Sequence, residues 1–314
     1  MKIAVINTGG TISCVGNPLA PMTAQAFADA STQLLNPILL QQFPDLEITY
    51  LTNVTFPESS TQTLDSTNLQ PTDWCIMAKG VLDNYAAFDG FVLLHGTDSM
   101  DFSGAALSLL LNAFDADGVG TAVLSKPVII TGSQVPMYYQ ASSTAPLSFN
   151  FNTDAYQNVC GAVAAARSGI PEVGVYFQNH LYRGSRALKT NASEFDAFSS
   201  PNYPALAEYG VALSLFDSYW LPGPLHASSR KPPATVLAKM PGAAGSGRPS
   251  VISRRRFFFF AKIASAAASA PGDFAAAYER CFADGAEAIV SIHVAGLLSG
   301  TIKSAQIARD MLPD

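Results

Sequence analysis

The sequence has no excess of basic residues and no long apolar run. Its 18 Lys and Arg residues are outnumbered by 24 Asp and Glu residues, which gives a formal net charge of −6. Binding to nucleic-acid phosphates needs a basic surface, so we expect no nucleic-acid partner. Met1 and Lys2 stand directly before the apolar run Ile3–Ile6, which is too short for a signal-peptide core or a membrane span. These features predict a cytoplasmic protein without a membrane partner.

Cysteine and histidine are also scarce, with four of each in the chain. Their positions show neither the paired spacing of zinc ligands nor a disulfide framework. We therefore expect no metal site, and we interpret the cysteines as small buried hydrophobic side chains. The cysteines are Cys14, Cys75, Cys160 and Cys281, and the histidines are His95, His180, His226 and His293.

What the sequence does contain is a repeated alternation of apolar β-rich runs and helical patterns. Strands that are apolar on both faces and alternate with helices are typical of a parallel sheet covered on both sides. The sequence thus predicts an α/β fold with a parallel, doubly wound sheet. The predicted strands are Lys2–Asn7, Glu47–Leu51, Phe91–His95, Pro127–Thr131 and Glu172–Phe177, and the predicted helices are Ala24–Gln42, Thr72–Tyr85, Ser99–Phe114 and Asp154–Ala166.

A change in composition divides the chain. A single hydrophobic core stops growing at about 250–300 residues, so 314 residues favour two domains. The stretch Pro222–Ser250 is rich in Pro, Gly, Ser and Ala, as linkers are. We predict a domain over residues 1–221, a linker region over 222–251 and a smaller C-terminal α/β segment over 252–314. That segment holds one helix–strand–helix pattern, so it is incomplete as an α/β domain.

Hydroxyl and carboxylate side chains directly follow two predicted strands. Thr8-Gly9-Gly10-Thr11 follows the first strand, and Gly96-Thr97-Asp98 follows the third. Ligands of open α/β sheets bind in the crevice outside the strand carboxyl ends, so these segments can share a site. The glycines allow a tight turn whose amides can stabilise an oxyanion, and a threonine hydroxyl is a candidate nucleophile. In the structural alternative, Thr11 and Asp98 simply cap helices.

The segment Leu181–Arg186, followed by Lys189, is predicted to stand at the carboxyl end of a further strand and to supply an amine. A threonine hydroxyl is a weak nucleophile until a base takes its proton, and a partly buried lysine can be that base. We therefore interpret Thr97, Asp98 and Lys189 as a relay beside the nucleophile Thr11. The alternative is an ordinary solvent-exposed lysine.

The loop Asp65-Ser66-Thr67 is a further polar cluster. Its side chains are candidates for binding the carboxylate of a substrate. The same composition is also typical of an Asx or ST turn, in which the side chains bond to their own backbone.

Five motifs occur in order, at Thr8–Ile12, His95–Met100, Lys126–Gln134, Leu181–Lys189 and Phe195–Asn202. Together they resemble the bacterial L-asparaginase family, most closely its cytoplasmic type I branch. The resemblance covers about residues 1–220. Several ordered motifs at compatible spacing are far more specific than any one of them.

The resemblance implies an amidohydrolase that converts asparagine to aspartate and ammonia without a cofactor. It implies that Thr11 is the acyl-accepting nucleophile and that Thr97, Asp98 and Lys189 form a second triad. The family's site lies between subunits, so a homodimer or homotetramer is implied. Glutamine remains open as a substrate, because one methylene changes binding by only about 1–3 kcal/mol. The implied substrate-binding residues are Asp65, Ser66, Thr67, Gly96 and Ser133, with Ser66 and Asp98 holding the α-carboxylate and α-amino groups.

The sequence departs from the family in two places. The family's mobile loop after the first threonine usually carries a tyrosine, but Ser13–Met22 has none and Leu19 occupies that stretch. Residues of about 270–314 instead resemble part of a DegV-type fatty-acid-binding protein. An asparaginase-like protein that binds or senses an amino acid without turnover is therefore an alternative. The amidase subunit of an archaeal-type glutamyl-tRNA amidotransferase shares these motifs, but it carries an extra N-terminal domain, so we favour the amidohydrolase.

Overall fold

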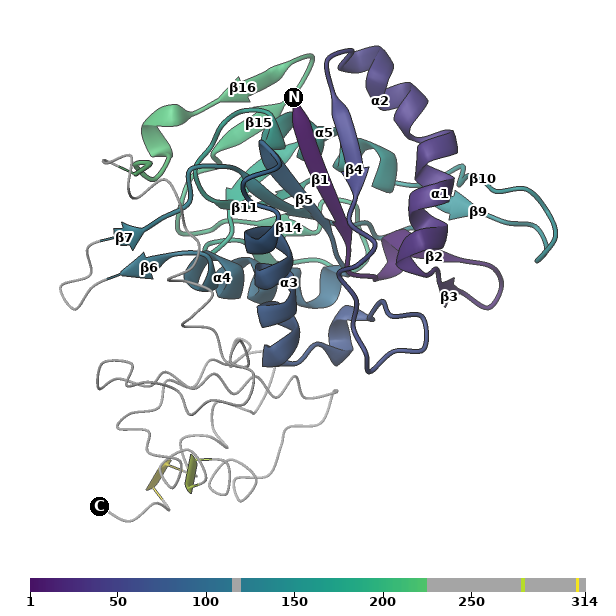
Figure 1. Ribbon diagram of the computed structural model, residues 1–314, viewed down its shortest axis with the longest axis horizontal. Helices are drawn as coiled ribbons and strands as arrows, with labels where there is room; N and C mark the ends of the chain where they lie inside the picture. Colours follow the sequence, from purple (N-terminus) through teal and green to yellow (C-terminus); the bar gives the residue numbers. More distant parts are fainter. Residues whose placement is uncertain (115–119, 225–277, 280–308, 311–314) are drawn as a thin grey trace. The chain divides into compact units, whose positions relative to one another are not determined.

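A computed structural model of the protein describes residues 1–114, 120–224, 278–279 and 309–310 (Figure 1). The chain divides into two compact units, Met1–Met240 and Pro241–Asp314. Every element given below belongs to the first unit. Nearly all of the predicted linker and C-terminal segment lies outside the described residues, so the domain boundaries that we place at residues 221 and 251 stay predictions.

An eight-stranded sheet runs through the first unit (Figure 1). Its parallel part has the order β4 (Glu47–Tyr50), β1 (Lys2–Asn7), β5 (Gly90–Leu94), β8 (Val128–Thr131) and β11 (Val173–Phe177). Beyond β11 the sheet continues with the antiparallel strands β12 (His180–Arg183), β15 (Ala207–Tyr209) and β16 (Leu213–Leu215). All five predicted strands are present, and the predicted parallel α/β sheet is confirmed.

Helices cover both faces of the sheet, because successive residues of a buried strand point to opposite sides. Ile3 and Val5 of β1 pack in one core cluster with α1 (Ala24–Leu34), α2 (Asn36–Gln42) and α5 (Ala155–Ala166). The opposite face, to which Ile6 points, is covered by α3 (Pro71–Asp83) and α4 (Met100–Leu110), which lie in front of the sheet in Figure 1. The sheet is therefore doubly wound, as predicted.

The structure corrects two of the predicted helices. The predicted helix Ala24–Gln42 is interrupted at Leu35, because Pro37 in the first turn of α2 has no N–H to donate to the preceding turn. The helix predicted to reach Phe114 ends at Leu110, and the chain then forms β6 (Ala113–Phe114), which pairs with β7 (Gly120–Ala122).

The first unit contains three further pairs of short strands outside the eight-stranded sheet. They are β2 (Cys14–Val15) with β3 (Ala20–Pro21), β9 (Tyr138–Tyr139) with β10 (Ser148–Phe149), and β13 (Leu188–Lys189) with β14 (Phe198–Ser199). The first hairpin follows β1 directly. The third carries Lys189.

The strand order determines where a ligand can bind. The chain crosses from β1 to β4 on one side and then returns to β5 on the other side of β1. The connections therefore leave β1 and β5 in opposite directions, which opens a crevice outside the carboxyl ends of these two strands. The short 3-10 helices η1 (Thr11–Ser13) and η3 (Thr97–Ser99) follow β1 and β5. Both predicted threonines thus stand at the topological switch point, which is the place between β1 and β5 where the direction of the connections reverses.

The structure corrects the position predicted for Leu181–Arg186. Strand β12 is antiparallel to β11, so this segment runs away from the crevice, and Gly184 N donates to Val173 O at the opposite edge of the sheet. The chain then turns back along α4. A Cβ on Gly104 of that helix would lie 2.6 Å from Gly184 O, so the two backbones pass in direct contact. This return path carries Lys189 to the crevice.

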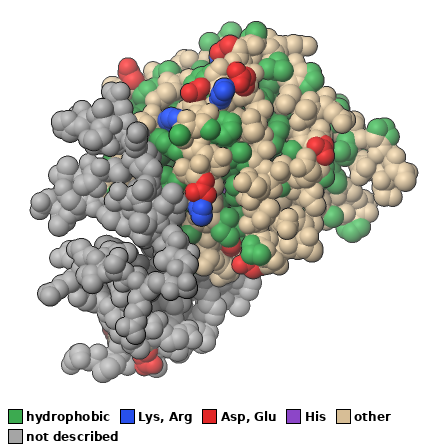
Figure 2. Space-filling model, viewed as in Figure 1, with side chains coloured by type: hydrophobic (Ala, Val, Ile, Leu, Met, Phe, Trp, Pro, Cys, Tyr) green, Lys and Arg blue, Asp and Glu red, His purple; other side chains and the backbone are tan. Residues whose placement is uncertain are grey.

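Charged side chains are sparse on the first unit. On the face in Figure 2, isolated Lys and Arg side chains lie among Asp and Glu side chains, without a basic patch. Within the described ranges, none of the helices combines the length and apolar character that crossing a bilayer requires.

The crossing of α4 by the return segment predicts the effect of a small substitution. We expect Gly104→Ala to lower the free energy of unfolding by about 1–3 kcal/mol, because the new methyl group must displace backbone rather than a side chain. Leu109→Ala is the control, since Leu109 lies on the same helix and is 54% exposed. Urea unfolding of both variants measures the difference. Equal stability of Gly104→Ala and the parent would contradict the close crossing.

Candidate active site

Two glycine turns and a serine meet at the switch point. Gly10 has a φ of 82°, and a Cβ at this position would overlap the Cα of Gly96. A Cβ on Gly96 would in turn lie 2.5 Å from Ser66 Oγ. Only glycine permits this approach of the backbones. Thr11 and Thr97, each next to one of these glycines, are thereby anchored to contacting segments.

The backbone amides of the first turn already have partners. Gly9 N donates to Asn7 Oδ1 at 3.1 Å, and Gly10 N donates to Leu64 O at 3.0 Å. These bonds fix the turn against β1 and against the segment before Ser66. The two amides are therefore not free to stabilise an oxyanion, which the sequence allowed them to do.

Thr11 begins η1 and is partly exposed, whereas the next residue, Ile12, is fully buried. Burial of Ile12 fixes the start of η1. Among the described residues, no hydrogen bond engages the Thr11 hydroxyl and none joins it to Lys189. The hydroxyl is thus held on an ordered turn with its oxygen available to a substrate.

Lys189 joins the two polar side chains that follow β5. Its Nζ donates to Thr97 Oγ1 at 2.8 Å and to Asp98 Oδ1 at 2.7 Å. The Lys189 side chain is 14% exposed and that of Asp98 is 58% exposed. The amine is thus largely removed from solvent while the carboxylate stays accessible. These are the three residues that the sequence grouped in one relay.

Gln134 is a member of this network that the sequence motifs did not single out. The Thr97 hydroxyl donates to Gln134 Oε1 at 3.1 Å, and Gln134 Nε2 donates to Glu194 O at 3.2 Å. Thr97 therefore accepts from an amine and donates to an amide. Gln134 stands beside Ser133 at the end of the motif Lys126–Gln134, so its position after the fourth parallel strand was the available signal.

Asp154 fixes the backbone around Gln134. Its carboxylate accepts from Gln134 N at 3.0 and 3.1 Å and from Val135 N at 3.1 Å. Burial raises the pKa of Asp154, and these backbone hydrogen bonds act in the opposite direction. The buried carboxyl thus anchors the loop that carries the amide partner of Thr97.

Asp101, which no sequence motif indicated, holds the backbone of the lysine. Its Oδ2 accepts from Lys189 N at 3.2 Å. Burial raises the pKa of Asp101, while hydrogen bonds from Lys189 N and Phe102 N lower it. The residue lies on the first turn of α4, so this contact ties the return segment to the helix that follows Thr97.

The predicted substrate-binding residues fall in different environments. Ser66 is buried beside Gly96, and its carbonyl accepts from Ser99 Oγ at 2.6 Å. Asp65 and Thr67 are exposed, and Asp65 Oδ1 accepts from both N and Oγ1 of Thr67, which is the Asx-type turn left open above. Ser133 is fully buried and donates to Val135 O at 2.6 Å. Their roles toward a substrate stay predictions.

The structure's described residues contain no group of three or more His, Cys, Asp or Glu side chains that could hold a metal ion. The side chains that the structure places at the crevice supply hydroxyl, amine and carboxylate groups. A hydroxyl beside an amine–carboxylate pair can act as an acyl acceptor.

The side chain of His95 supports the turn at Gly96 through hydrogen bonds. It is fully buried, its Nδ1 bonds to Gly96 O at 2.7 Å, and its Nε2 bonds to Ser103 Oγ at 2.8 Å. Trp74 Nε1 donates to the same Ser103 oxygen at 2.7 Å. Burial lowers the pKa of His95 to about 4, although the bond to Gly96 acts in the other direction. A neutral imidazole is therefore part of the support for Gly96.

Known proteins share this arrangement of the chain. A family model described as asparaginase, N-terminal, matches residues 2–219. The chain belongs to the asparaginase family. A second model, for an uncharacterised protein of the DegV family, matches residues 258–314, which confirms the predicted DegV-type resemblance of the tail. Nearly all of that segment lies outside the described residues.

Individual relatives agree with the asparaginase family. L-asparaginase 1 of Escherichia coli K12 is 35% identical over 211 residues, which are 67% of this chain and 54% of that protein. A glutamyl-tRNA(Gln) amidotransferase subunit of Methanobrevibacter smithii is 30% identical over 215 residues, covering 66% of this chain and 42% of its own length. L-asparaginase I of Vibrio cholerae has a solved structure with 29% identity and a TM-score of 0.55, covering 72% and 59% of the two chains. The chain thus spans about half the length of the curated relatives that it matches.

The buried histidine predicts how stability depends on pH in this asparaginase-family chain. The folded pKa of about 4 lies below the ordinary value of 6.5. Between these values the unfolded chain binds more protons, so stability is lost as the pH falls from 6.5 toward 4. The loss reaches about 3 kcal/mol at most.

Urea unfolding at several pH values between 7 and 4 measures this dependence. We expect His95→Gln, which cannot titrate, to lose less stability than the parent over the same range, whatever its stability at pH 7. Parallel pH dependences of the two proteins would contradict a neutral, buried His95.

Proposed function

We propose that the chain hydrolyses L-asparagine to aspartate and ammonia through a threonine acyl-enzyme. The observation that carries this proposal is the placement of Lys189 Nζ within 2.8 Å of Thr97 Oγ1 and 2.7 Å of Asp98 Oδ1. This pair lies at the switch point, where the unengaged hydroxyl of Thr11 also stands. Membership of the asparaginase family supports the same reaction.

In this mechanism Thr11 Oγ1 attacks the side-chain amide carbon of asparagine. The Thr11 proton passes through the Thr97–Lys189 pair to the departing nitrogen, and ammonia leaves. A water then attacks the β-aspartyl ester, returns a proton to Thr11 and releases aspartate. Asp98, whose Oδ1 accepts from Lys189 Nζ at 2.7 Å, stabilises positive charge on the amine during this transfer.

Asp98 has a second use toward the substrate. Its carboxylate is 58% exposed, so one oxygen can bind Lys189 while the other meets the α-ammonium group of asparagine. Ser66, which is held beside Gly96, is our candidate for the α-carboxylate. No cofactor is required by these steps.

The nucleophile is tested by ammonia release from asparagine. We expect Thr11→Ala to lower the rate by at least about 10³-fold, because it removes the acyl acceptor, and Lys189→Met to lower it by about 10²–10⁴-fold. Thr144→Ala is the matched control, since Thr144 is exposed on the loop between β9 and β10 and is not among the predicted site residues. Equal ammonia release by the parent and Thr11→Ala would overturn the proposal.

The alternative is a protein of this family that binds an amino acid without turnover. The loop Ser13–Met22 favours it, because this stretch holds Leu19 and lacks the tyrosine that the family usually carries there. Leu19 is 58% exposed in the loop between β2 and β3, so a larger polar side chain meets no packing obstacle there. Asparagine binding by equilibrium dialysis with no ammonia release would select this alternative.

Leu19→Tyr tests the part played by that loop. We expect the new hydroxyl to raise kcat for asparagine by about tenfold or more, since a general acid–base contact contributes about 10²–10⁴-fold. Leu19→Phe is the control that adds the ring without the hydroxyl. An equal rise in both variants would show that the ring, and not proton transfer, is responsible.

Three further statements remain predictions for this chain. They are the homodimer or homotetramer, the cytoplasmic location and the preference for asparagine over glutamine. A Campylobacter jejuni neighbour is described as a probable cytoplasmic L-asparaginase, but at 20% identity it supports the fold alone. The amidotransferase relative keeps a second amidase substrate open.

A further inference from the structure

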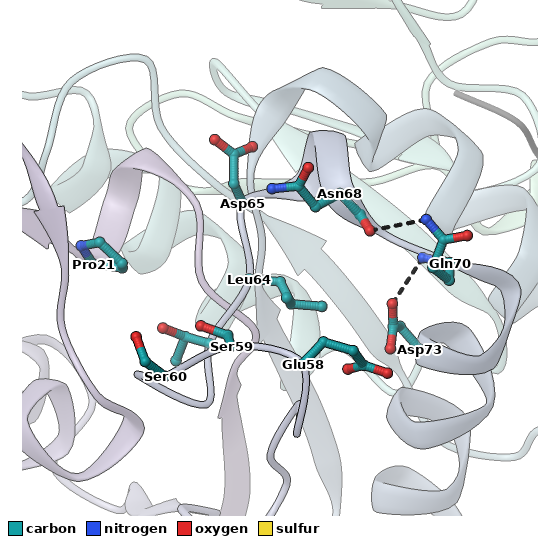
Figure 3. A pocket seen from close by; sticks show the side chains of 10 residues that line it. Pro21, Glu58, Ser59, Ser60, Leu64, Asp65, Asn68, Gln70 and Asp73 are labelled. Atoms are coloured by element: carbon teal, nitrogen blue, oxygen red, sulfur yellow. Dashed lines mark hydrogen bonds between the residues drawn. The ribbon is translucent and has the colours of Figure 1, made fainter. Parts of the chain in front are cut away.

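A cavity of about 440 Å³ lies beside the crevice and shares with it one of the predicted substrate-binding residues, Asp65 (Figure 3). Its volume is within the range of small-molecule sites in proteins. Ten residues between Pro21 and Asp73 line it, and Thr11, Thr97, Asp98 and Lys189 are not among them. One wall is formed by Leu64 and Asp65, the segment whose carbonyl at Leu64 holds Gly10 N.

The lining of this cavity is acidic. Glu58, Asp65 and Asp73 are among the ten residues, and none of the ten is Lys, Arg or His. Neither Glu58 nor Asp73 forms an ion pair with any residue that the structure describes. Hydroxyl and amide side chains, including those of Ser60 and Asn68, make up most of the remainder. The cavity therefore presents negative charge and hydrogen-bond acceptors without a protein cation.

Asp73 is the side chain that most needs an explanation. The residue is only 1% exposed. Its Oδ2 accepts from Gln70 N at 2.7 Å, which caps the first turn of α3, but its Oδ1 has no hydrogen-bond partner in the described part of the chain. Leaving a buried carboxylate oxygen unpaired costs free energy. The helix cap accounts for one oxygen and leaves the other free.

The free oxygen faces a second carboxylate. In Figure 3 the Glu58 side chain extends toward Asp73, and the unbonded oxygen of Asp73 is turned to that side. Burial raises the pKa of Asp73, and the charge of Glu58 raises it further. Two carboxylates so placed repel each other unless a proton or a cation lies between them.

We propose that this cavity binds a small organic cation, whose primary ammonium group lies between Asp73 and Glu58. An ammonium has three N–H donors, so it can satisfy Asp73 Oδ1, Glu58 and a neutral acceptor at once. A bare metal ion fits less well, because the described residues contain no group of three carboxylate, His or Cys ligands. The cavity is also large enough to hold the carbon chain that carries the ammonium.

Binding is measured by isothermal titration calorimetry on the full chain with 1,4-diaminobutane as the probe, at low ionic strength and pH 7.5. We expect sub-millimolar affinity that falls with added salt, because partly exposed charges are screened. Succinate, which has the same chain length and opposite charge, and magnesium chloride serve as ligand controls, and neither should bind comparably.

Two variants locate the site. We expect Asp73→Asn to weaken diamine binding by about tenfold or more and Glu58→Gln by at least about threefold, because each removes a charge-assisted hydrogen bond. Asp83→Asn is the matched control, since Asp83 lies at the other end of the same helix, pairs with Lys79 and does not line the cavity. Glu58 is exposed, so Glu58→Gln keeps the test valid if Asp73→Asn does not fold.

Absence of diamine binding by the parent would overturn the proposal. So would binding that neither Asp73→Asn nor Glu58→Gln weakens more than Asp83→Asn does, and so would magnesium binding as tightly as the diamine. The assay contains no asparagine and measures no turnover. Its result is therefore independent of whether the chain is an amidohydrolase.

Discussion

Two backbone turns can lie in contact at the carboxyl edge of this sheet only because each carries a glycine. Gly10 ends the turn after β1, Gly96 begins the turn after β5, and a methyl group on either would overlap its neighbour or Ser66. Tight backbone packing of this kind leaves no freedom to shift one turn without the other. The positions of Thr11, Thr97 and Ser66 are consequently set by backbone contact rather than by the side chains themselves.

The amine arrives by a different route. Lys189 does not follow a parallel strand but stands on a segment that returns from the far edge of the sheet along α4. The glycine pair Gly104 and Gly184 permits that passage, and Asp101 holds the end of it. Because the same helix begins at Met100, just beyond η3 and its Thr97, one element positions both partners of the 2.8 Å contact. Attachment of both groups to one helix limits their relative movement, and well-fixed geometry is what a catalytic contact requires.

The acidic cavity shares a wall with this framework. Its Leu64–Asp65 side is the same segment that accepts from Gly10 N and leads to Ser66. An occupant of the cavity would therefore contact the Leu64–Asp65 segment on one side, while the other side of this segment borders the crevice. The two sites nevertheless have opposite requirements, because the crevice supplies its own cation in Lys189 whereas the charged side chains of the cavity lining are all carboxylates.

The sequence by itself determined the parallel sheet, the alternation of helices and the grouping of Thr97, Asp98 and Lys189. These depend on local periodicity and on motifs that keep their order along the chain, and both are visible without coordinates. Only the tertiary structure decided how Lys189 reaches the site, that Gln134 contacts Thr97, and that one oxygen of Asp73 stays unpaired. The packing of whole elements against one another sets these contacts, and no short stretch of sequence encodes them.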